Sequence, residues 1–323
     1  GQYTDTVYFG TEVPGATIYT NPDASNMFKD NHLTWVGMDI NKIYDSANPS
    51  TPYFFNTSKT ANISGMFSNI QLSSTGIPFD CTNGNGVSPF GLMDTSSVTK
   101  AETVFEDSSY LNLSGIEHWD MTHVTSIRGM FKRCTAMNFS PIAGWDVHSV
   151  TDISHFFDMI GSGCTIPWGM GNWHFDNLQR IYGFYNLYMS NDRHALNFTN
   201  WDFSHTSDTH LVLNGCPSKI GIGANMLNAN GEFLAPYPGQ EHGWKNEATN
   251  DFYFYSDPNF SFNQNHNEFA DAYKANPSGM SGVYIGSKDY YHYFYRSDSE
   301  YKSAYYKKNQ FGTTVTIAPA PSS

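Results

Sequence analysis

The chain has 323 residues with 39% hydrophobic and 16% aromatic content, which suffices for two ordinary domains or for one elongated repeat array with a packed core. Its 30 acidic and 17 basic residues give a net charge of -13, which argues against DNA, RNA or an anionic membrane as the partner at neutral pH. No apolar run approaches the roughly 20 residues that cross a bilayer, so we expect no membrane insertion.

Residues 1–50 contain no repeated pattern, and we expect them to form an N-terminal cap. A repeat follows within residues 51–235, where the segment Trp119–Phe131 recurs 26 residues later as Trp145–Phe157. Weaker copies contain Phe67, Met93, Trp173 and Trp201. We therefore expect about six repeats of 26–28 residues, each too small to bury its apolar face without its neighbours.

Each repeat contains two patterns of apolar residues. A short alternating run such as Leu111–Leu113 is typical of a strand with one buried face. Thr125 stands where a helix N-cap is expected, and Ile127, Met130 and Phe131 after it have the spacing of the inner face of a helix. The sequence therefore predicts an α/β array with one short strand and one short helix per repeat, stacked into a curved solenoid with a parallel sheet on one side.

Tryptophan and aspartate recur at a constant phase of the repeats. The tryptophans are Trp119, Trp145, Trp173 and Trp201. We expect them to stack as a structural spine, and a platform for carbohydrate is the alternative. The aspartates are Asp94, Asp120, Asp146 and Asp202, and His174 interrupts their row. They suit acceptors for backbone N–H groups in turns, whereas a calcium ladder or catalytic carboxylates would need a continuous row or a paired site.

The four cysteines are too few and too widely spaced for a disulfide-stapled miniprotein or a zinc ribbon. They are Cys81, Cys134, Cys164 and Cys216. The last three stand at repeat positions, where buried thiols are expected. Cys134 and Cys164 fall on adjacent repeats, so a disulfide between them is the alternative if their Cα atoms lie within about 7 Å.

No phosphate-binding loop, metal-ligand spacing or nucleophile elbow occurs, so we predict no catalytic residue, metal or cofactor.

Two basic groups on this acidic chain are candidate ligand-binding sites. The first is Arg128, Lys132 and Arg133 on the predicted helix of the best repeat, where exposed charges are otherwise merely solvated. The second lies in residues 236–323, expected to form an aromatic, β-rich C-terminal cap or subdomain followed by the start of a linker. Its candidate residues are Tyr291, Tyr293, Tyr295, Arg296, Lys302, Lys307 and Lys308. Tyrosine rings stack on sugars and cations pair with sulfate or carboxylate, although a strand with lysines at its exposed edge is the alternative.

The repeat pattern of Trp145–Asp146, Val150–Thr151, Ile153 and Phe156–Phe157 resembles that of the BspA-like leucine-rich-repeat surface proteins of bacteria. The resemblance covers about residues 55–222 and weakens outward, where Gln179 replaces the cap threonine. It implies a leucine-rich-repeat-like right-handed solenoid, capped at both ends. It also implies a secreted or wall-anchored protein without catalytic residues.

Together these observations predict a bacterial cell-surface adhesin domain and not an enzyme. The expected partners are glycans or glycoproteins of the host extracellular matrix, of mucus or of glycosaminoglycan type, bound more tightly at acid pH as the 12 histidines gain charge. We expect a monomeric domain of a longer secreted protein, anchored to a Gram-positive cell wall through segments outside this sequence. The alternative is a structural spacer or protein-protein interaction module of such a protein.

Overall fold

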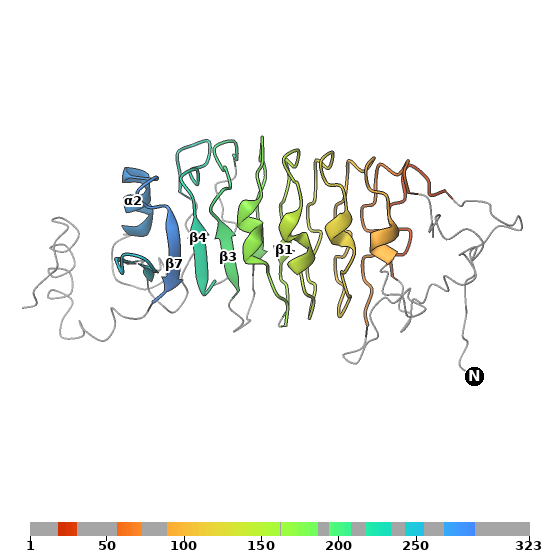
Figure 1. The fold of residues 1–323 in the computed structure, drawn as a ribbon, viewed down its shortest axis with the longest axis horizontal. Coiled ribbons are helices and arrows are strands. Elements are labelled where there is room, and N and C mark those ends of the chain that lie inside the picture. The colour runs from red at the N-terminus through yellow and green to blue at the C-terminus, as the bar shows by residue number, and fades with distance from the viewer. Residues whose placement is uncertain are drawn as a thin grey trace, which may run out of the picture.

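The computed structural model describes residues 19–30, 57–72, 89–161, 163–186, 194–207, 217–233, 243–254 and 268–287. In chain order its 3-10 helices (η), strands and α-helix are η1 (Pro89–Leu92), η2 (Ile116–His118), η3 (Ser140–Gly144), β1 (Phe157–Asp158), η4 (Trp168–Asn172), β2 (Tyr185–Asn186), β3 (Ala195–Phe198), β4 (Lys219–Ile222), β5 (Gly243–Asn246), β6 (Phe252–Phe254), α2 (Glu268–Ala275) and β7 (Gly282–Gly286). The described segments follow one another along the long axis of the molecule, and β7 and α2 lie at the end opposite residues 19–30 (Figure 1).

Successive copies of the repeat are joined by single parallel bridges at a constant phase. The bridged positions are Asp23, Asn62, Lys100, Ser126, Asp152 and Arg180. After each bridge, alternate N–H groups donate to carbonyls of the next copy. Ile127 N donates to Asp152 O at 3.0 Å, and Gly129 N donates to Ser154 O at 2.8 Å. We call these six bridged copies the bridge ladder; its first copy lies within residues 1–50, which were expected to form a cap.

The segment predicted to be a helix in each repeat is a run of tight turns. Gly129 and Arg133 have φ angles of 62° and 56°, in the left-handed region that an α-helix does not contain. The equivalent positions of other copies also have positive φ; they include Asn26, Asp30, Gly65, Asn69, Thr103, Asp107, His155, Met159 and Gly183. Thr125 is not an N-cap, because its hydroxyl donates to Thr99 O of the preceding copy at 3.1 Å. The predicted helix in each repeat is therefore wrong.

The predicted fold class, a leucine-rich-repeat-like solenoid with one strand and one helix per repeat, is corrected by the same observations. Among the described residues, regular strands form a two-stranded sheet of β1 and β2 and a five-stranded sheet in the order β3-β4-β7-β5-β6. The α-helix of the described part, α2, lies outside the repeats. The run Leu111–Leu113 forms no strand, since Asn112 Oδ1 accepts the N–H of Ser114 in a turn. Apolar spacing indicated which residues are buried, but consecutive turns bury the same residues as a helix would.

Aromatic columns form the core of the bridge ladder. The four repeat tryptophans are at most 4% exposed, and their rings stack with centroids 5.9 to 6.3 Å apart. Each indole N–H donates to a carbonyl of the preceding copy, as Trp145 Nε1 does to Ile116 O at 2.7 Å. The structural spine predicted from the sequence is confirmed, and these buried rings offer no platform to carbohydrate.

The five-stranded sheet continues from the last described copies. β3 and β4 pair in parallel, whereas β7 pairs antiparallel with β4 and with β5, and β6 pairs antiparallel with β5. α2 contacts the adjoining chain through Tyr273, whose hydroxyl donates to Gly223 O at 2.6 Å and accepts the N–H of Met226 at 3.0 Å. The sheet therefore joins segments that are far apart in the sequence (Figure 1).

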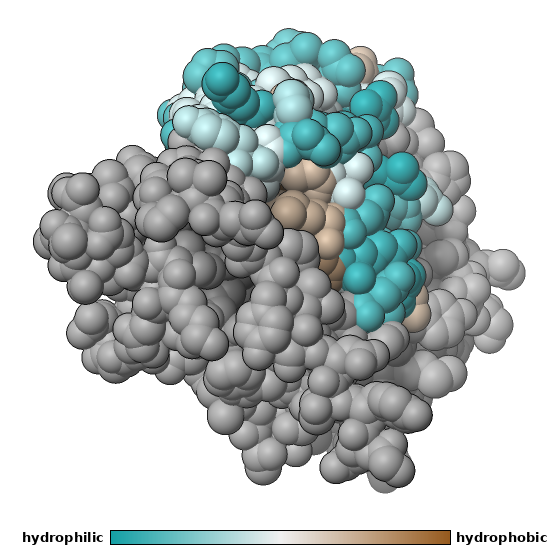
Figure 2. Space-filling model, turned by 90° about the vertical axis from the view of Figure 1, so that its right-hand side faces the viewer, coloured by the Kyte–Doolittle hydropathy of each residue, from teal (hydrophilic) through white to brown (hydrophobic). Residues whose placement is uncertain are grey.

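Hydrophilic side chains make up most of the described surface on the face that Figure 2 shows, and one larger apolar area lies beside them. The large apolar side chains that are exposed are Tyr19, Met27, Tyr110, Met159 and Tyr182. Within the described ranges no helix has the length and apolar character required to span a membrane.

Candidate functional site

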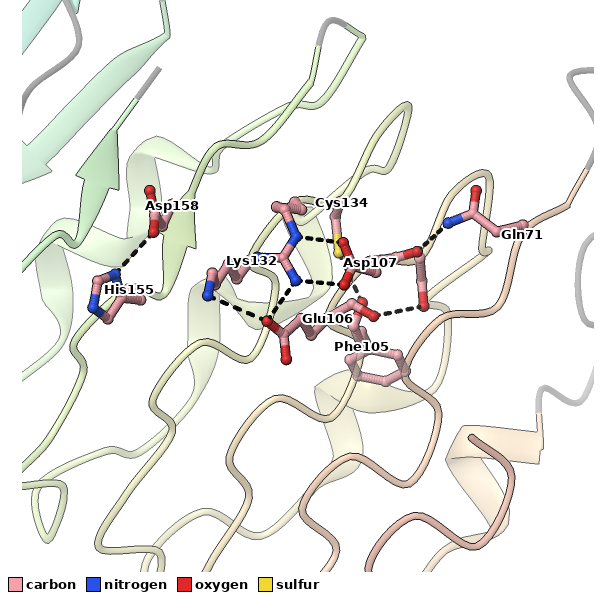
Figure 3. Close-up of polar contacts among 10 residues, drawn as sticks. Gln71, Phe105, Glu106, Asp107, Lys132, Cys134, His155 and Asp158 are labelled. Atoms are coloured by element: carbon pink, nitrogen blue, oxygen red, sulfur yellow. Dashed lines mark hydrogen bonds and ion pairs between the residues drawn. The ribbon is translucent and has the colours of Figure 1, made fainter. Parts of the chain in front are cut away.

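The structure places Lys132 and Arg133 of the predicted basic group opposite carboxylates of the preceding copy of the bridge ladder, and Figure 3 shows Lys132 beside Glu106. Arg133 donates from Nε to Asp107 Oδ1 and from Nη2 to Asp107 Oδ2, both at 2.5 Å. Lys132 Nζ lies 3.4 Å from Glu106 Oε1. The hydrogen bonds to Asp107 raise the pKa of Arg133 further above its ordinary value. Two of the three predicted cations are therefore engaged in ion pairs within the protein.

Arg128 differs from the other two members of this group. Its side chain is exposed, and it forms no ion pair with the described residues. Its carbonyl accepts the N–H of Thr103, which holds it beside the preceding copy at 2.8 Å. Arg128 is thus the member of the predicted group most open to an external anion.

Two further cations lie at bridged positions of the same ladder. Lys100 Nζ lies 3.3 Å from Glu102 Oε2, and Arg180 Nε lies 2.7 Å from Asp152 Oδ2. We call the set the cationic flank; its members are Lys100, Arg128, Lys132, Arg133 and Arg180. Lys100 and Arg180 are at the bridged phase, whereas Arg128, Lys132 and Arg133 follow the bridged Ser126 by two, six and seven residues, so the set falls on three copies of the ladder.

The repeated aspartates serve the turns of the ladder. Asp120 Oδ1 accepts the N–H and the hydroxyl of Thr122 at 3.0 and 2.6 Å, and these hydrogen bonds lower the pKa of Asp120. Asp94 and Asp202 accept the N–H groups of Ser96 and Ser204 in the same way. The turn role predicted for the aspartates is confirmed. In the described part of the chain, no set of three or more histidine, cysteine, aspartate or glutamate side chains is placed to hold a metal ion.

Histidines stand beside some of these aspartates. His148 Nδ1 and Asp146 Oδ1 lie 2.8 Å apart, and His174 Nε2 lies 3.1 Å from Asp176 Oδ1. The hydrogen bond with Asp146 raises the pKa of His148, and the same bond lowers the pKa of Asp146. We call Asp146, His148, His174 and Asp176 the acidic edge of the ladder; its His148 becomes charged at a higher pH than an unpaired imidazole does.

Cys134 and Cys164 are free and buried, so the alternative of a disulfide between them is excluded. Cys134 Sγ donates to Phe105 O at 3.0 Å (Figure 3), and burial raises the pKa of this thiol well above its ordinary value. A neutral, hydrogen-bonded thiol in the core is a poor nucleophile. Cys81 and Cys216 lie outside the described residues.

The predicted C-terminal candidates also lie outside the described residues. They are Tyr291, Tyr293, Tyr295, Arg296, Lys302, Lys307 and Lys308. Tyr284, from the same tyrosine-rich region, belongs to β7, and its buried hydroxyl donates to Met280 O at 2.8 Å. In the described part of this region, the tyrosine side chain is therefore buried in the core and is not exposed to a ligand.

A pair of side chains that the sequence did not single out lies at the five-stranded sheet. Lys219 Nζ on β4 lies 5.3 Å from the ring centroid of Trp168, at the start of η4. The same nitrogen lies 3.0 and 2.9 Å from the two carboxylate oxygens of Glu247. Trp168 is out of phase with the tryptophan spine, and that departure is the sequence signal that could have indicated a different role.

Residues 75–201 match the model of a family described as "Mycoplasma protein of unknown function, DUF285". The matched range contains the tryptophan spine and the copies of the ladder from Lys100 to Arg180. No curated protein and no solved structure matches the chain. The repeat region is thus similar to a family whose description assigns no activity.

Proposed function

We propose that this chain is a non-catalytic adhesin domain of a secreted bacterial surface protein, related to the BspA-like surface proteins and anchored to a Gram-positive cell wall. Its ligands are host glycans or glycoproteins, in particular anionic glycans of the glycosaminoglycan and mucus type. The observation that carries the proposal is the cationic flank, in which three of the six bridged copies of an acidic chain carry five cations.

The arrangement of the flank suits a polymeric anion. Neighbouring copies lie about 5 Å apart, the separation of paired strands, so the copies that carry Lys100 and Arg128 are adjacent and Arg180 lies two copies further along the ladder. A polyanion that contacts several of them releases its own counter-ions, which favours binding and makes it sensitive to salt. Arg128 is open to such a ligand. Lys132 and Arg133 can bind it only after their ion pairs with Glu106 and Asp107 break.

Acid pH should strengthen this binding. Carboxyl groups have reference pKa values near 4, so a fall from pH 7.4 to about 4.5 begins to neutralise carboxylates of this acidic chain. Histidines become charged over the same interval, and His148 does so from a raised pKa. The net charge of the domain therefore rises from -13 toward zero, which reduces the repulsion of a polyanion.

Binding to heparin, chondroitin sulfate and a glycan array at pH 7.4 and pH 4.5, repeated in raised salt, tests the proposal. We expect salt-sensitive binding that is tighter at pH 4.5. The double variant R128Q/K132Q should weaken it by about fivefold or more, and K29Q/K274Q, at two exposed lysines outside the flank, is the control with the same charge change. Binding that is flat or weaker in acid contradicts the charge-based mechanism.

A structural spacer or protein-protein interaction module is the second candidate. The ion pairs of Lys132 and Arg133 favour it, because they already satisfy two cations of the flank inside the protein. This candidate predicts no glycan binding at either pH. If no glycan in the screen binds at either pH, the spacer or protein-protein interaction module replaces the adhesin as the proposed function.

A further inference from the structure

Trp168 is set apart from the spine by its surroundings. The four spine tryptophans are buried, whereas the side chain of Trp168 is partly exposed. Its position is fixed by Asn197 of β3, whose Nδ2 donates to Trp168 O at 3.0 Å. A Cβ at Gly171 of η4 would lie 2.1 Å from Asn197 Nδ2, so a glycine is required for this close approach. η4 is thereby held against the sheet, with Trp168 beside Lys219.

The register of the sheet places a second lysine on the same face. Lys219 of β4 pairs with Ile285 of β7, and Ile285 pairs with Lys245 of β5. Paired residues of neighbouring strands point to the same face, so both lysines lie on the face that carries Asn197 and Trp168. Two strand separations put the lysine backbones about 10 Å apart, on either side of the partly exposed Ile285.

An indole ring and two ammonium groups on one sheet face form an unusual combination in a chain with 17 basic residues among 323. The face of an indole packs against the apolar face of a sugar ring, and ammonium groups pair with carboxylate or sulfate. Glu247, 40% exposed, holds both of its oxygens within 3.0 Å of Lys219 Nζ. The ammonium group of Lys219 therefore already binds a carboxylate of the protein itself.

We propose that Trp168, Lys219 and Lys245 form a subsite for one acidic sugar unit, with Glu247 as the internal carboxylate that the ligand displaces. The sugar ring stacks on Trp168, and its carboxylate or sulfate takes the place of Glu247 at Lys219. The subsite rests on the proposed function for its ligand class, but it lies on the five-stranded sheet and not on the cationic flank. No covalent step is involved.

The test uses the whole chain and a size-defined heparin hexasaccharide at pH 7.4, with binding followed by calorimetry and by tryptophan fluorescence. E247Q removes the competing charge, and it should tighten binding roughly two- to fivefold. W168A should weaken binding roughly tenfold, and W168F should restore part of the loss. K219Q should weaken binding roughly three- to tenfold. E117Q and K274Q make the same charge changes elsewhere and should leave the affinity unchanged.

The outcomes separate the subsite from the proposed function. If the unmodified chain binds no acidic saccharide at either pH 7.4 or pH 4.5, the proposed function fails and the subsite fails with it. If it binds, but E247Q, W168A and K219Q bind like the unmodified chain, the subsite alone is overturned and the binding belongs to another surface. A gain of affinity in E247Q that E117Q does not share cannot come from misfolding, and it supports the displacement of Glu247.

Discussion

The bridge ladder and the five-stranded sheet are built from contacts of different range. In the ladder, a residue contacts its equivalent in the next copy, so Phe131 packs on Phe105 and Phe157 at the same phase. In the sheet, Ile220 pairs with Tyr284, and Tyr273 binds the backbone at Gly223. The repeat period in the sequence therefore identifies which residues are neighbours in the bridge ladder. It does not identify the neighbours in the five-stranded sheet.

The largest expected effect comes from the core of the ladder. Phe131 is fully buried and lies between rings of both neighbouring copies, so Phe131→Ala leaves a cavity that two copies share. We expect a loss of about 3–5 kcal/mol in the free energy of unfolding. Urea denaturation followed by tryptophan fluorescence measures it, with the exposed Gln179→Ala as the control. A loss below about 1 kcal/mol would mean that the copies are not packed through this column.

The corresponding test in the sheet is Tyr273→Phe. The substitution removes a hydroxyl and leaves the carbonyl of Gly223 and the N–H of Met226 without this partner. Loss of a partner for buried polar groups costs about 1–3 kcal/mol. Tyr253→Phe is the matched control, since the hydroxyl of Tyr253 makes no hydrogen bond with the described residues and its burial raises the pKa to about 12. Equal unfolding midpoints for the two variants would argue against Tyr273 as the link between α2 and the sheet.

These two regions also show what the sequence could predict. The spine tryptophans, the turn aspartates and the buried Cys134 were predictable, because each recurs or falls at a fixed phase and a stacked core requires that. The conformation of Ile127–Phe131 was not predictable from apolar spacing, since a helix and consecutive tight turns, each with one residue of positive φ, bury the same residues. Gly129 inside the predicted helix was the available warning, because glycine is unfavourable in a helix interior and favoured at positive φ.

The candidate site also has a part that the sequence could predict and a part that depends on the register of the fold. Arg128, Lys132 and Arg133 were found as a local cluster, but the carboxylates that neutralise two of them come from the preceding copy. Predicting that pairing required the correct register between copies. Trp168, Lys219 and Glu247 come from three segments of the chain, and only the register of β3, β4, β7 and β5 brings them together.

Gly183→Ala tests the turn geometry of the ladder, and its expected effect on stability is intermediate in size. Gly183 has a φ of 63°, and a Cβ there would lie 2.7 Å from His155 Nδ1. The left-handed conformation alone costs an alanine about 1–2 kcal/mol. Gly144→Ala in η3 is the control, because a Cβ there meets no atom within 4 Å. Thermal unfolding should show a lower midpoint for Gly183→Ala and little change for Gly144→Ala. A lower midpoint for Gly144→Ala alone would contradict the positive φ assigned to Gly183.

The smallest expected effect concerns the acidic edge of the ladder. The hydrogen bond with Asp146 raises the pKa of His148 in the folded protein. The contribution of this histidine to stability is therefore fully present below its unfolded pKa of about 6.5, and it is lost as the pH rises through the higher folded value. The pKa of Asp146 is lowered, so its own contribution is lost as the pH falls through that lowered value.

The pair therefore stabilises the fold most between about pH 4 and pH 6.5, by well under about 1 kcal/mol because both groups are screened by solvent. An NMR titration of the imidazole signals measures the effect directly, since a stability difference this small is hard to detect by unfolding. In Asp146→Asn, the midpoint of His148 should fall, because the carboxylate that favours the charged ring is gone. A midpoint unchanged in this variant would show that Asp146 does not set the charge of His148, and this pair would then contribute nothing special to the acid response proposed for the domain.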